Sequence, residues 1–367
     1  MARDLTRPAL TELVPYEPGK PVEEVQRELG LERVVKLASN EGQFGPFPAA
    51  LAALERGQPN LNRYPDGGAW RLVQALAEKH GVEPANVAVA AGADAIISYL
   101  CLATLDPGDE VVFGWPSFAS YPLATMKMGA TPVRVPLTDY AYDVEQILAA
   151  VSTRTKIVFL CNPNNPTGTM ISRAAVEHFL ERVPGHVLTV LDEAYFEYVG
   201  EPDYPDGIDE HVKPGRDVLV LRTFSKIYGL AGLRVGYGIG PKEVVDSLKR
   251  VRNAFDITQA AQDAALASLG DEQELARRRA FNAEARGHLV ELCSGFELGL
   301  APQPVANFVF AEVGEDARPV FEALLREGVI VRPLASFGAP GAIRVTVGTK
   351  EENEHFAQAF GRVQALA

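Results

Sequence analysis

The sequence LVLRTFSKIYGLAGLRVGY, residues 219–237, begins as an apolar run and then changes in character. An apolar run of this kind is typical of a buried strand. Hydroxyl residues, one lysine, three glycines and an arginine follow it. A lysine directly after a buried strand is poorly placed for solubility alone, because an ammonium group is costly to desolvate. Desolvation favours the neutral amine, so Lys226 is a candidate for forming a Schiff base with an aldehyde.

Three neighbours of this lysine carry the groups that a phosphate needs. Thr223 and Ser225 offer hydroxyls, and Arg234 offers a planar charged fork. An aldehyde that carries a phosphate is pyridoxal phosphate, which the stretch therefore suggests as cofactor. The same residues also fit a capped helix start with a solvated lysine and an unrelated arginine. The rest of the chain decides between these two interpretations.

Composition narrows the class of protein. The chain has 367 residues, of which 47% are hydrophobic and 23% charged, values typical of a globular protein with two domains. Its net charge of −13 argues against nucleic acid or an anionic membrane as partner. Three distant cysteines without C-x-x-C spacing argue against a zinc site or a disulfide framework. With no signal-peptide pattern and no bilayer-length apolar segment, we expect a cytoplasmic protein.

Strand-like and helix-like segments alternate through the middle of the chain, which predicts an α/β fold with a large, doubly wound, mostly parallel sheet. The predicted strands of this sheet are 87–90, 110–113, 132–135, 156–161, 187–191, 218–221 and 235–239. Further strands at 307–310, 329–332 and 342–347, with helices around them, predict a smaller α+β domain. We expect an N-terminal segment, 1–40, packing with the small domain, a cofactor-binding domain, 41–250, and the small domain, 251–367.

Unusual side chains stand at the carboxyl ends of the predicted strands, where ligands bind in such sheets. Ala93 and Asp94 open a helix whose free N–H groups suit an anion, although Asp94 also fits an ordinary cap. Phe118 offers a ring that could stack on a flat heterocycle, or simply fill the core. Asn165, in a loop with two prolines, offers an amide to a phenolate oxygen, or only forms a turn.

Asp192 directly follows an apolar strand, so its carboxylate needs a cationic partner. A protonated pyridine nitrogen would serve, and so would a structural ion pair. Tyr195, three residues later, could reach the oxygen of the same ring. The sequence lacks four motifs of other enzyme classes, namely G-x-G-x-x-G opening a first βα unit, G-x-x-x-x-G-K-[ST], G-x-S-x-G and H-x-x-x-H. The residues that a nicotinamide, nucleotide or serine-hydrolase site requires are therefore absent from the sequence.

Taken together, these motifs resemble the fold type I pyridoxal-phosphate aminotransferases, and more closely the histidinol-phosphate aminotransferase family. The resemblance runs from about residue 15 to the C-terminus. The segments that carry it are Leu37–Glu41, Arg63–Gly67, Gly92–Asp94, Asn162–Gly168, Asp192–Tyr195, Ser225–Arg234 and Ile343–Thr349.

The resemblance implies a role for each matching residue around the cofactor. Lys226 would hold the aldehyde and then move the substrate proton, while Asp192 would keep the ring nitrogen protonated. Asn165 and Tyr195 would hydrogen-bond the ring oxygen, and Phe118 would stack on the ring. The implied phosphate-binding groups are Thr223, Ser225, Arg234 and the backbone of Ala93 and Asp94.

The resemblance also implies a homodimer with shared sites, in which Tyr64 reaches the phosphate of the neighbouring subunit's cofactor. Arg344 would bind the anionic end of the substrate with help from Arg332, and Tyr16 and Asn40 would line the substrate pocket. From the residues alone, both arginines interrupt apolar strands, so they form either an anion clamp or structural ion pairs.

The reaction that the resemblance implies is transamination of L-histidinol phosphate with 2-oxoglutarate, in histidine biosynthesis, whereas the residues alone indicate only an amine with an anionic end. Two departures from the family pattern are Ala95, where many relatives carry an acid, and Gly42–Phe44. Phe44 adds an aromatic ring near the expected substrate entrance, which favours an aromatic amino acid aminotransferase as an alternative. A threonine-phosphate decarboxylase and a non-enzymatic regulator are further alternatives.

Overall fold

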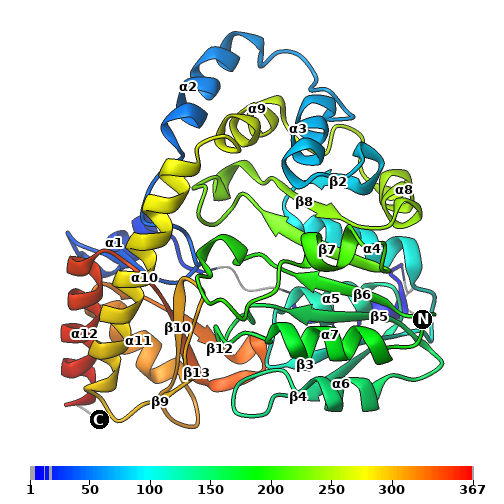
Figure 1. Cartoon of the computed structure of the whole chain (residues 1–367). Coiled ribbons are helices and arrows are strands. Elements are labelled where there is room, and N and C mark those ends of the chain that lie inside the picture. The colour runs from blue at the N-terminus through cyan, green and yellow to red at the C-terminus, as the bar shows by residue number, and fades with distance from the viewer. Residues whose placement is uncertain (1–4, 12, 16–18, 366–367) are drawn as a thin grey trace.

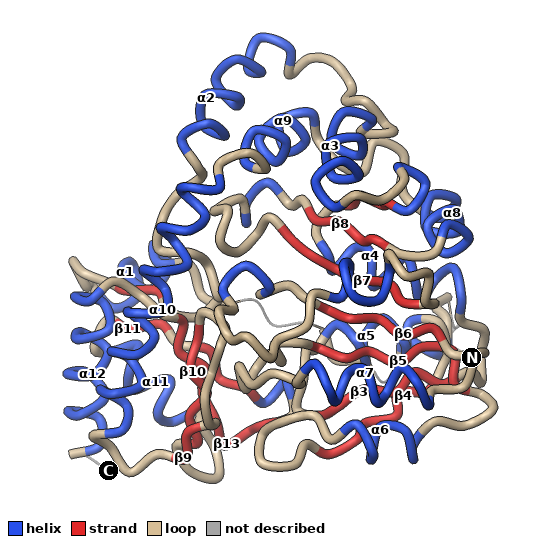
Figure 2. The backbone as a smooth tube through the Cα atoms, in the orientation of Figure 1, coloured by secondary structure: helices blue, strands red, loops and turns tan. Residues whose placement is uncertain are grey.

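The computed structural model describes residues 5–11, 13–15 and 19–365 of the chain. Its elements gather around a seven-stranded sheet and a four-stranded sheet, with a two-stranded sheet as a third pairing. Figure 1 shows the large sheet on the right and the small one at the lower left, and Figure 2 shows helices around both. No helix among the described residues is long and apolar enough to cross a bilayer.

The large sheet has the strand order β2-β8-β7-β6-β5-β3-β4. Its central strands β5, β6 and β7 are mostly apolar and mostly buried, as expected of a sheet covered by helices on both faces. Strands β4, β3, β5, β6 and β7 pair in parallel, whereas β8 pairs antiparallel with both β7 and β2. The prediction of a mostly parallel, doubly wound sheet is therefore confirmed. The strands are β2 (Val87–Ala90), β3 (Glu110–Trp115), β4 (Thr131–Pro136), β5 (Thr155–Cys161), β6 (Leu188–Asp192), β7 (Val218–Thr223) and β8 (Gly236–Ile239).

Helices cover both faces of the large sheet. In Figure 1, α7 lies in front of the sheet and α4 and α5 lie behind it. Polar side chains begin several of these helices by accepting backbone N–H groups, as Asp143 does for α6 and Ser172 for α7. The helices of this part are α2 (Pro48–Gly57), α3 (Trp70–His80), α4 (Ala93–Thr104), α5 (Ser120–Lys127), α6 (Val144–Ala150), α7 (Arg173–Arg182), α8 (Lys242–Val251) and α9 (Gln259–Ser268).

The small sheet is antiparallel, in the order β12-β13-β10-β9, and has its own apolar core. Beside it, β1 (Val35–Lys36) pairs in parallel with β11 (Val329–Ile330), which brings the N-terminal segment against this part. The other elements are β9 (Gly299–Leu300), β10 (Phe308–Glu312), β12 (Arg332–Leu334), β13 (Ala339–Thr346), α1 (Val22–Leu29), α10 (Glu272–Ser294), α11 (Arg318–Arg326) and α12 (Lys350–Gln364).

The predicted strand 329–332 is wrong in one respect, because it is divided between two sheets. Val329 and Ile330 pair with β1, whereas Arg332 pairs with Arg344 of β13. The chain therefore changes its partner strand at Val331. The structure also has short 3₁₀ helices η1 (Pro8–Leu10), η2 (Gln58–Asn60), η3 (Pro84–Asn86), η4 (Phe196–Tyr198), η6 (Ala231–Leu233) and η7 (Ala335–Phe337), and a π-helix η5 (Ile208–Val212).

Helix α10 connects the two large parts of the molecule. Near its start, the Arg278 guanidinium donates to the Ile227 carbonyl, 3.0 Å away, beside the end of the large sheet. One turn later, Asn282 donates to the Ala306 carbonyl, and Ala285 and Leu289 belong to the core of the small sheet. The division of the chain at residues 40 and 250 stays a prediction.

Candidate active site

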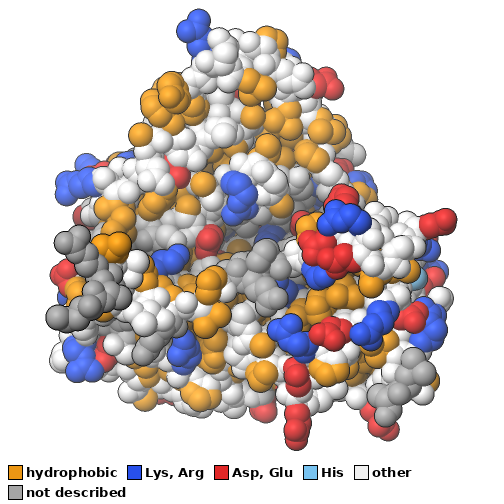
Figure 3. Space-filling view, turned by 180° about the vertical axis from the view of Figure 1, so that it is seen from behind, with side chains coloured by type: hydrophobic (Ala, Val, Ile, Leu, Met, Phe, Trp, Pro, Cys, Tyr) orange, Lys and Arg blue, Asp and Glu red, His pale blue; other side chains and the backbone are white. Residues whose placement is uncertain are grey.

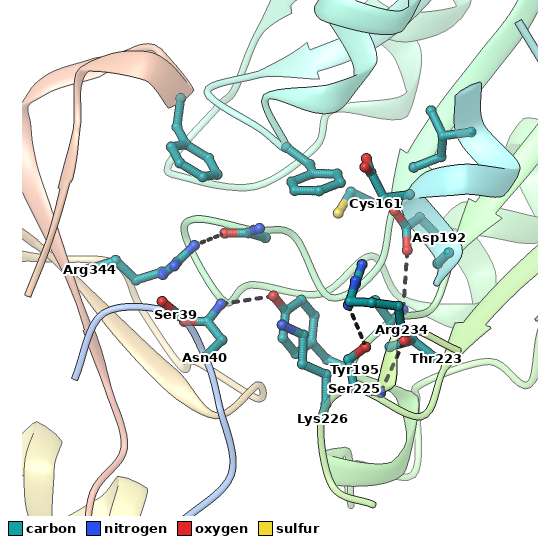
Figure 4. A pocket seen from close by; sticks show the side chains of 17 residues that line it. Ser39, Asn40, Cys161, Asp192, Tyr195, Thr223, Ser225, Lys226, Arg234 and Arg344 are labelled. Atoms are coloured by element: carbon teal, nitrogen blue, oxygen red, sulfur yellow. Dashed lines mark hydrogen bonds between the residues drawn. The ribbon is translucent and has the colours of Figure 1, made fainter. Parts of the chain in front are cut away.

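A cavity of about 160 Å³ opens where the ends of β5, β6 and β7 face the small sheet. Figure 4 shows its side chains converging from both parts, with Arg344 on one side and Asp192 on the other. Most of the predicted site residues line it, and they come from segments that are far apart in the sequence. Those that line it are Asn40, Ala93, Asp94, Phe118, Asn165, Asp192, Tyr195, Thr223, Ser225, Lys226, Arg234 and Arg344.

Lys226 projects into the middle of this cavity from the loop after β7. Its Nζ lies 5.5 Å from the centroid of the Tyr195 ring. Desolvation, with the positive charges of Arg344 and Arg234 nearby, lowers the pKa of Lys226 to about 8, although Glu41 and Asp192 act in the opposite direction. Near neutral pH a useful fraction of this amine is therefore uncharged and nucleophilic.

Asp192 ends β6 and is only 3% exposed. Its Oδ2 accepts a hydrogen bond from the Tyr121 hydroxyl at 2.6 Å, and its Oδ1 accepts the Ala194 N–H at 3.2 Å. Burial raises the pKa of this carboxyl above its usual range, while the Tyr121 hydrogen bond opposes that rise. A buried carboxylate at the wall of a cavity is suited to pair with a cation bound there.

Asn40 and Tyr195 form a buried pair beside the lysine. The Asn40 side-chain amide donates to the Tyr195 hydroxyl at 2.8 Å (Figure 4). Asn40 has a φ of 54°, a left-handed conformation that asparagine tolerates better than most residues. Its backbone N–H and side-chain Oδ1 both bond to the Thr346 hydroxyl of β13. The N-terminal segment, the small sheet and the large sheet therefore meet at this pair.

A cradle for an anion lies at the start of α4. Gly92, at φ 87°, precedes the free N–H groups of this helix, and a Cβ there would come within 2.7 Å of Arg234 Nη2. A Cβ on Gly236 would come within 2.5 Å of the Ala93 nitrogen. Arg234 Nη1 donates to the Ser225 hydroxyl at 3.3 Å, and Thr223 Oγ1 accepts the Ser225 N–H at 3.1 Å. Donors and positive charge thus converge where a phosphate would fit.

Arg344 reaches the other end of the cavity from β13. It is 4% exposed, and its guanidinium donates to Asn165 Oδ1 and, at 2.7 Å, to the Ala38 carbonyl. Its guanidinium carbon also lies 5.4 Å from the centroid of the Phe337 ring. These contacts fix the side chain in an orientation that presents positive charge to the cavity.

Two of the predicted site residues that the structure describes do not line the cavity. Tyr64 is 82% exposed and stacks on Phe255, with ring centroids 4.6 Å apart. Arg332 lies next to Arg344 in the sheet register, but its guanidinium lies over the Phe337 ring and it lines a separate depression beside α1 and α11. Tyr16 falls outside the described residues.

Phe44, which was expected to add an aromatic ring near the substrate entrance, is not among the residues that line the cavity, so its place at the entrance stays a prediction. Its ring packs edge-on against Phe281 with centroids 4.9 Å apart, and the Arg277 guanidinium carbon lies 4.3 Å above it. Both partners belong to α10, whose position against this loop only the tertiary structure reveals.

Sequence reasoning missed several residues of the site. Ser39, Ile97, Cys161, Ala194 and Phe337 also line the cavity. Cys161 and Ala194 are adjacent to strand ends that the sequence did predict, so their positions could have been found. Phe337 and Tyr121 carry no such local signal, because each reaches the site through packing between distant segments. Among the described residues, no group of three or more His, Cys, Asp or Glu side chains could hold a metal ion.

These residues fit pyridoxal phosphate in chemical type and in arrangement. The cradle at α4 suits the phosphate, and Asp192 suits a protonated ring nitrogen. The amine of Lys226 suits the aldehyde, and Phe118, at the cavity wall, suits a flat ring.

Comparisons with known proteins agree with this chemistry. Residues 32–360 match the family model described as aminotransferase class I and II. A histidinol-phosphate aminotransferase of Moorella thermoacetica is 46% identical over 362 residues, which cover 98% of this chain and 93% of the relative. Histidinol-phosphate aminotransferase 2 of Pseudomonas aeruginosa is also 46% identical, over 98% of both chains.

Two solved structures are similar over nearly the whole chain. Histidinol-phosphate aminotransferase from Sinorhizobium meliloti, in complex with pyridoxal-5'-phosphate, has a TM-score of 0.90 at 29% sequence identity. The match covers 100% of this chain and 99% of the Sinorhizobium meliloti chain. A mutant aspartate aminotransferase of Thermus thermophilus has a TM-score of 0.85 at 26% identity and covers 98% of this chain and 100% of its own. The chain is therefore a pyridoxal-phosphate-dependent enzyme of the class I and II aminotransferase family, and it belongs with the histidinol-phosphate aminotransferases.

Proposed function

We propose that this enzyme transfers the amino group of L-histidinol phosphate to 2-oxoglutarate, giving imidazole-acetol phosphate and L-glutamate in histidine biosynthesis. The observation that carries the proposal is the position of Lys226 in one cavity between Asp192 and Arg344. The names of relatives at 46% identity over almost the whole chain support the choice of substrate.

Bound pyridoxal phosphate would supply an aldehyde for the amine and a ring that accepts electrons from the substrate carbon. We assign Lys226 Nζ two tasks, bonding to that aldehyde and then carrying the substrate proton. Both need an uncharged amine, which the lowered pKa of about 8 makes available. We assign Asp192 to hold the proton on the ring nitrogen, because it faces the cavity as a buried carboxylate.

We assign Tyr195 and Asn165 to hydrogen-bond the ring oxygen. Burial raises the pKa of Tyr195, so its hydroxyl stays protonated and acts as a donor. The side-chain amide of Asn40 donates to the oxygen of this Tyr195 hydroxyl. The hydroxyl proton is therefore directed away from Asn40. Asn165 Oδ1 accepts from Arg344, so the amide nitrogen of Asn165 remains to face a ligand.

Arg344 is assigned to the anionic end of the substrate. Its fork can bind the phosphate of histidinol phosphate and, in the second half-reaction, a carboxylate of glutamate. Arg332 is proposed to add positive charge behind it, since the two residues are register partners on adjacent strands. The substrate role of Tyr16 remains a prediction.

We infer that the enzyme is a homodimer with shared active sites. Large apolar side chains are exposed near the predicted partner-facing residue Tyr64, namely Leu61 at 70%, Trp70 at 65% and Phe255 at 47%. On the face seen in Figure 3, hydrophobic side chains gather on the upper part of the molecule, where Figure 1 places α2, α3 and α9. A second subunit would cover such surface, and Tyr64 would then be free to reach the partner's cofactor phosphate. We place the enzyme in the cytoplasm, as its cysteine usage suggests.

An aromatic amino acid is the second candidate substrate, because the Phe337 ring lines the cavity beside Arg344. An apolar aromatic side chain would pack against this ring, while Arg344 bound its carboxylate.

The experiment that decides between the substrates is a half-reaction without any 2-oxo acid. The purified holoenzyme is mixed separately with histidinol phosphate, phenylalanine and threonine phosphate, and the visible absorbance of the cofactor is followed. We expect histidinol phosphate to convert the cofactor to its amine form fastest. Faster conversion by phenylalanine would move the enzyme to the aromatic aminotransferases. Carbon dioxide released from threonine phosphate would indicate a decarboxylase.

A further inference from the structure

We propose that Tyr121 is a positioning residue of the reaction, which holds the Asp192 carboxylate ionised and aimed into the cavity. This inference rests on the proposed function, because it concerns the group assigned to the cofactor's ring nitrogen. Tyr121 does not line the cavity, so its hydroxyl would act only through Asp192.

The hydrogen bond from Tyr121 to Asp192 is short and fully buried. The hydroxyl lies 2.6 Å from Asp192 Oδ2, and Tyr121 is 0% exposed. A carboxylate is a strong acceptor, and a hydrogen bond to it is worth more than one between neutral groups. The other hydrogen bond to this carboxylate, from the Ala194 N–H, is longer at 3.2 Å. Tyr121 is therefore the principal donor to Asp192 among the described residues.

Packing fixes the Tyr121 ring so firmly that the hydroxyl cannot swing away from the carboxylate. The ring stacks on Phe159 of β5, with centroids 4.4 Å apart and an angle of 9° between the planes. It also meets Phe118 edge-on at 87°, with centroids 5.7 Å apart. The same ring therefore supports both the carboxylate assigned to the ring nitrogen and the aromatic side chain assigned to the ring face.

The proton of this hydrogen bond stays on the tyrosine. Burial and the nearby carboxylate both raise the pKa of Tyr121 far above its usual value. Burial and the charge of Asp94 favour the neutral form of Asp192, whereas Tyr121 and the charge of Lys226 favour its ionised form. The charge of Asp192 also acts on Cys161 and Tyr195, which face it from β5 and from the loop after β6. Tyr121 is the group whose hydrogen bond counters burial and Asp94 most strongly.

The test is a double-mutant cycle with Tyr121→Phe and Asp192→Asn, which separates a role through Asp192 from a general packing role. Tyr121→Phe removes only the hydroxyl, and we expect about a tenfold fall in kcat with KM for histidinol phosphate unchanged within about twofold. In the Asp192→Asn background the same change should have no further effect. Additive losses, or an unchanged kcat in the single variant, would overturn the inference.

A second readout does not depend on turnover. Removing the hydroxyl should raise the pKa of Asp192, so the holoenzyme of Tyr121→Phe should release its cofactor on acidification at a higher pH than the wild type does. Cofactor release is followed by loss of visible absorbance after gel filtration at a series of pH values. Release at an unchanged pH would contradict the proposal.

The matched control is Tyr237→Phe, because Tyr237 is also buried, at 2% exposure, but its hydroxyl bonds to His80. We expect it to lower the melting temperature as Tyr121→Phe does, without changing kcat or the pH of cofactor release.

If Tyr121→Phe does not fold, Phe159→Leu loosens the stacked ring and should lower kcat only when Asp192 is present. If Asp192→Asn alone leaves kcat unchanged, the assignment of Asp192 fails instead.

Discussion

The two ends of the cavity are built in different ways. The cofactor end is formed by the ends of neighbouring strands of the large sheet and by the start of helix α4. Asp192, Ser225 and the first residues of α4 all line it. The substrate end is assembled from distant segments, and Arg344 of β13 bonds there to Ala38 and Asn165. The comparison teaches that the chemistry of the cofactor end depends on one folded sheet, whereas substrate recognition depends on how the small sheet and the N-terminal segment meet it.

The largest expected effect belongs to the cofactor end, in the variant Lys226→Ala. Losing the amine removes both the bond to the aldehyde and the proton carrier, so we expect turnover to fall by ~10⁴-fold or more. The melting temperature should change little, since the Lys226 side chain makes no hydrogen bond to any residue that the structure describes. Steady-state assays with histidinol phosphate measure the loss, and added methylamine should restore part of it. Substantial turnover without an added amine would show that this residue is not the centre of the site.

The substrate end should respond in KM rather than in kcat. Arg344→Ala removes a charged fork from the anionic end, and we expect KM for histidinol phosphate to rise by about 10- to 100-fold. The control Arg344→Lys keeps the positive charge but loses the planar guanidinium. Its KM for histidinol phosphate should lie between those of the wild type and Arg344→Ala. Cofactor affinity should stay near the wild-type value in both variants. A fall in kcat with KM unchanged would break the distinction between the two ends.

The two ends also interact electrostatically, through Lys226. Its pKa of about 8 predicts that cofactor uptake by the apoenzyme accelerates as the pH rises through about 8 and then levels off, because the uncharged amine is the reactive form. Arg344 contributes to lowering this pKa. The midpoint should therefore move to a higher pH in Arg344→Ala. Stopped-flow absorbance at several pH values measures both midpoints, and an unmoved midpoint would mean that the ends are electrostatically independent.

The smallest effect on KM is expected for a substitution of Phe44. Comparing it with a substitution of Phe337 tests which residues belong to the substrate end. Phe337→Ala removes a ring from the cavity wall and should raise KM by roughly 10-fold, equivalent to about 1.4 kcal/mol of lost packing. Phe44→Ala should leave KM within about twofold, since this ring packs on α10, and should cost about 1 kcal/mol of unfolding free energy. A larger change in KM for Phe44→Ala would place the substrate entrance beside α10.

Much of the fold and the cofactor end was predictable from the sequence, for a physical reason. In α/β sheets the periodicity of apolar residues locates the strands, and the chemistry lies just after them. The strand β2 and the residues Asp192 and Lys226 could therefore be placed from local signals. The antiparallel direction of β8 and the division of β11 from β12 could not, because both depend on strand partners far away in the sequence.

The substrate end was harder to predict because its contacts join segments that are about 300 residues apart, such as Asn40 and Thr346. Phe44 illustrates the difficulty: nothing in the sequence indicates that its ring packs on Phe281 and Arg277 of α10. Tyr121 shows the reverse case, since nothing in its neighbourhood along the chain indicates a bond to Asp192.

The measurement that tests the account most directly is reduction of the holoenzyme with borohydride, followed by mass spectrometry of its peptides. Reduction fixes the cofactor to the residue that holds it. We predict a pyridoxyl label on the peptide that contains Lys226, and loss of that label when histidinol phosphate is added before reduction. A label on another lysine, or a label that histidinol phosphate leaves in place, would contradict it.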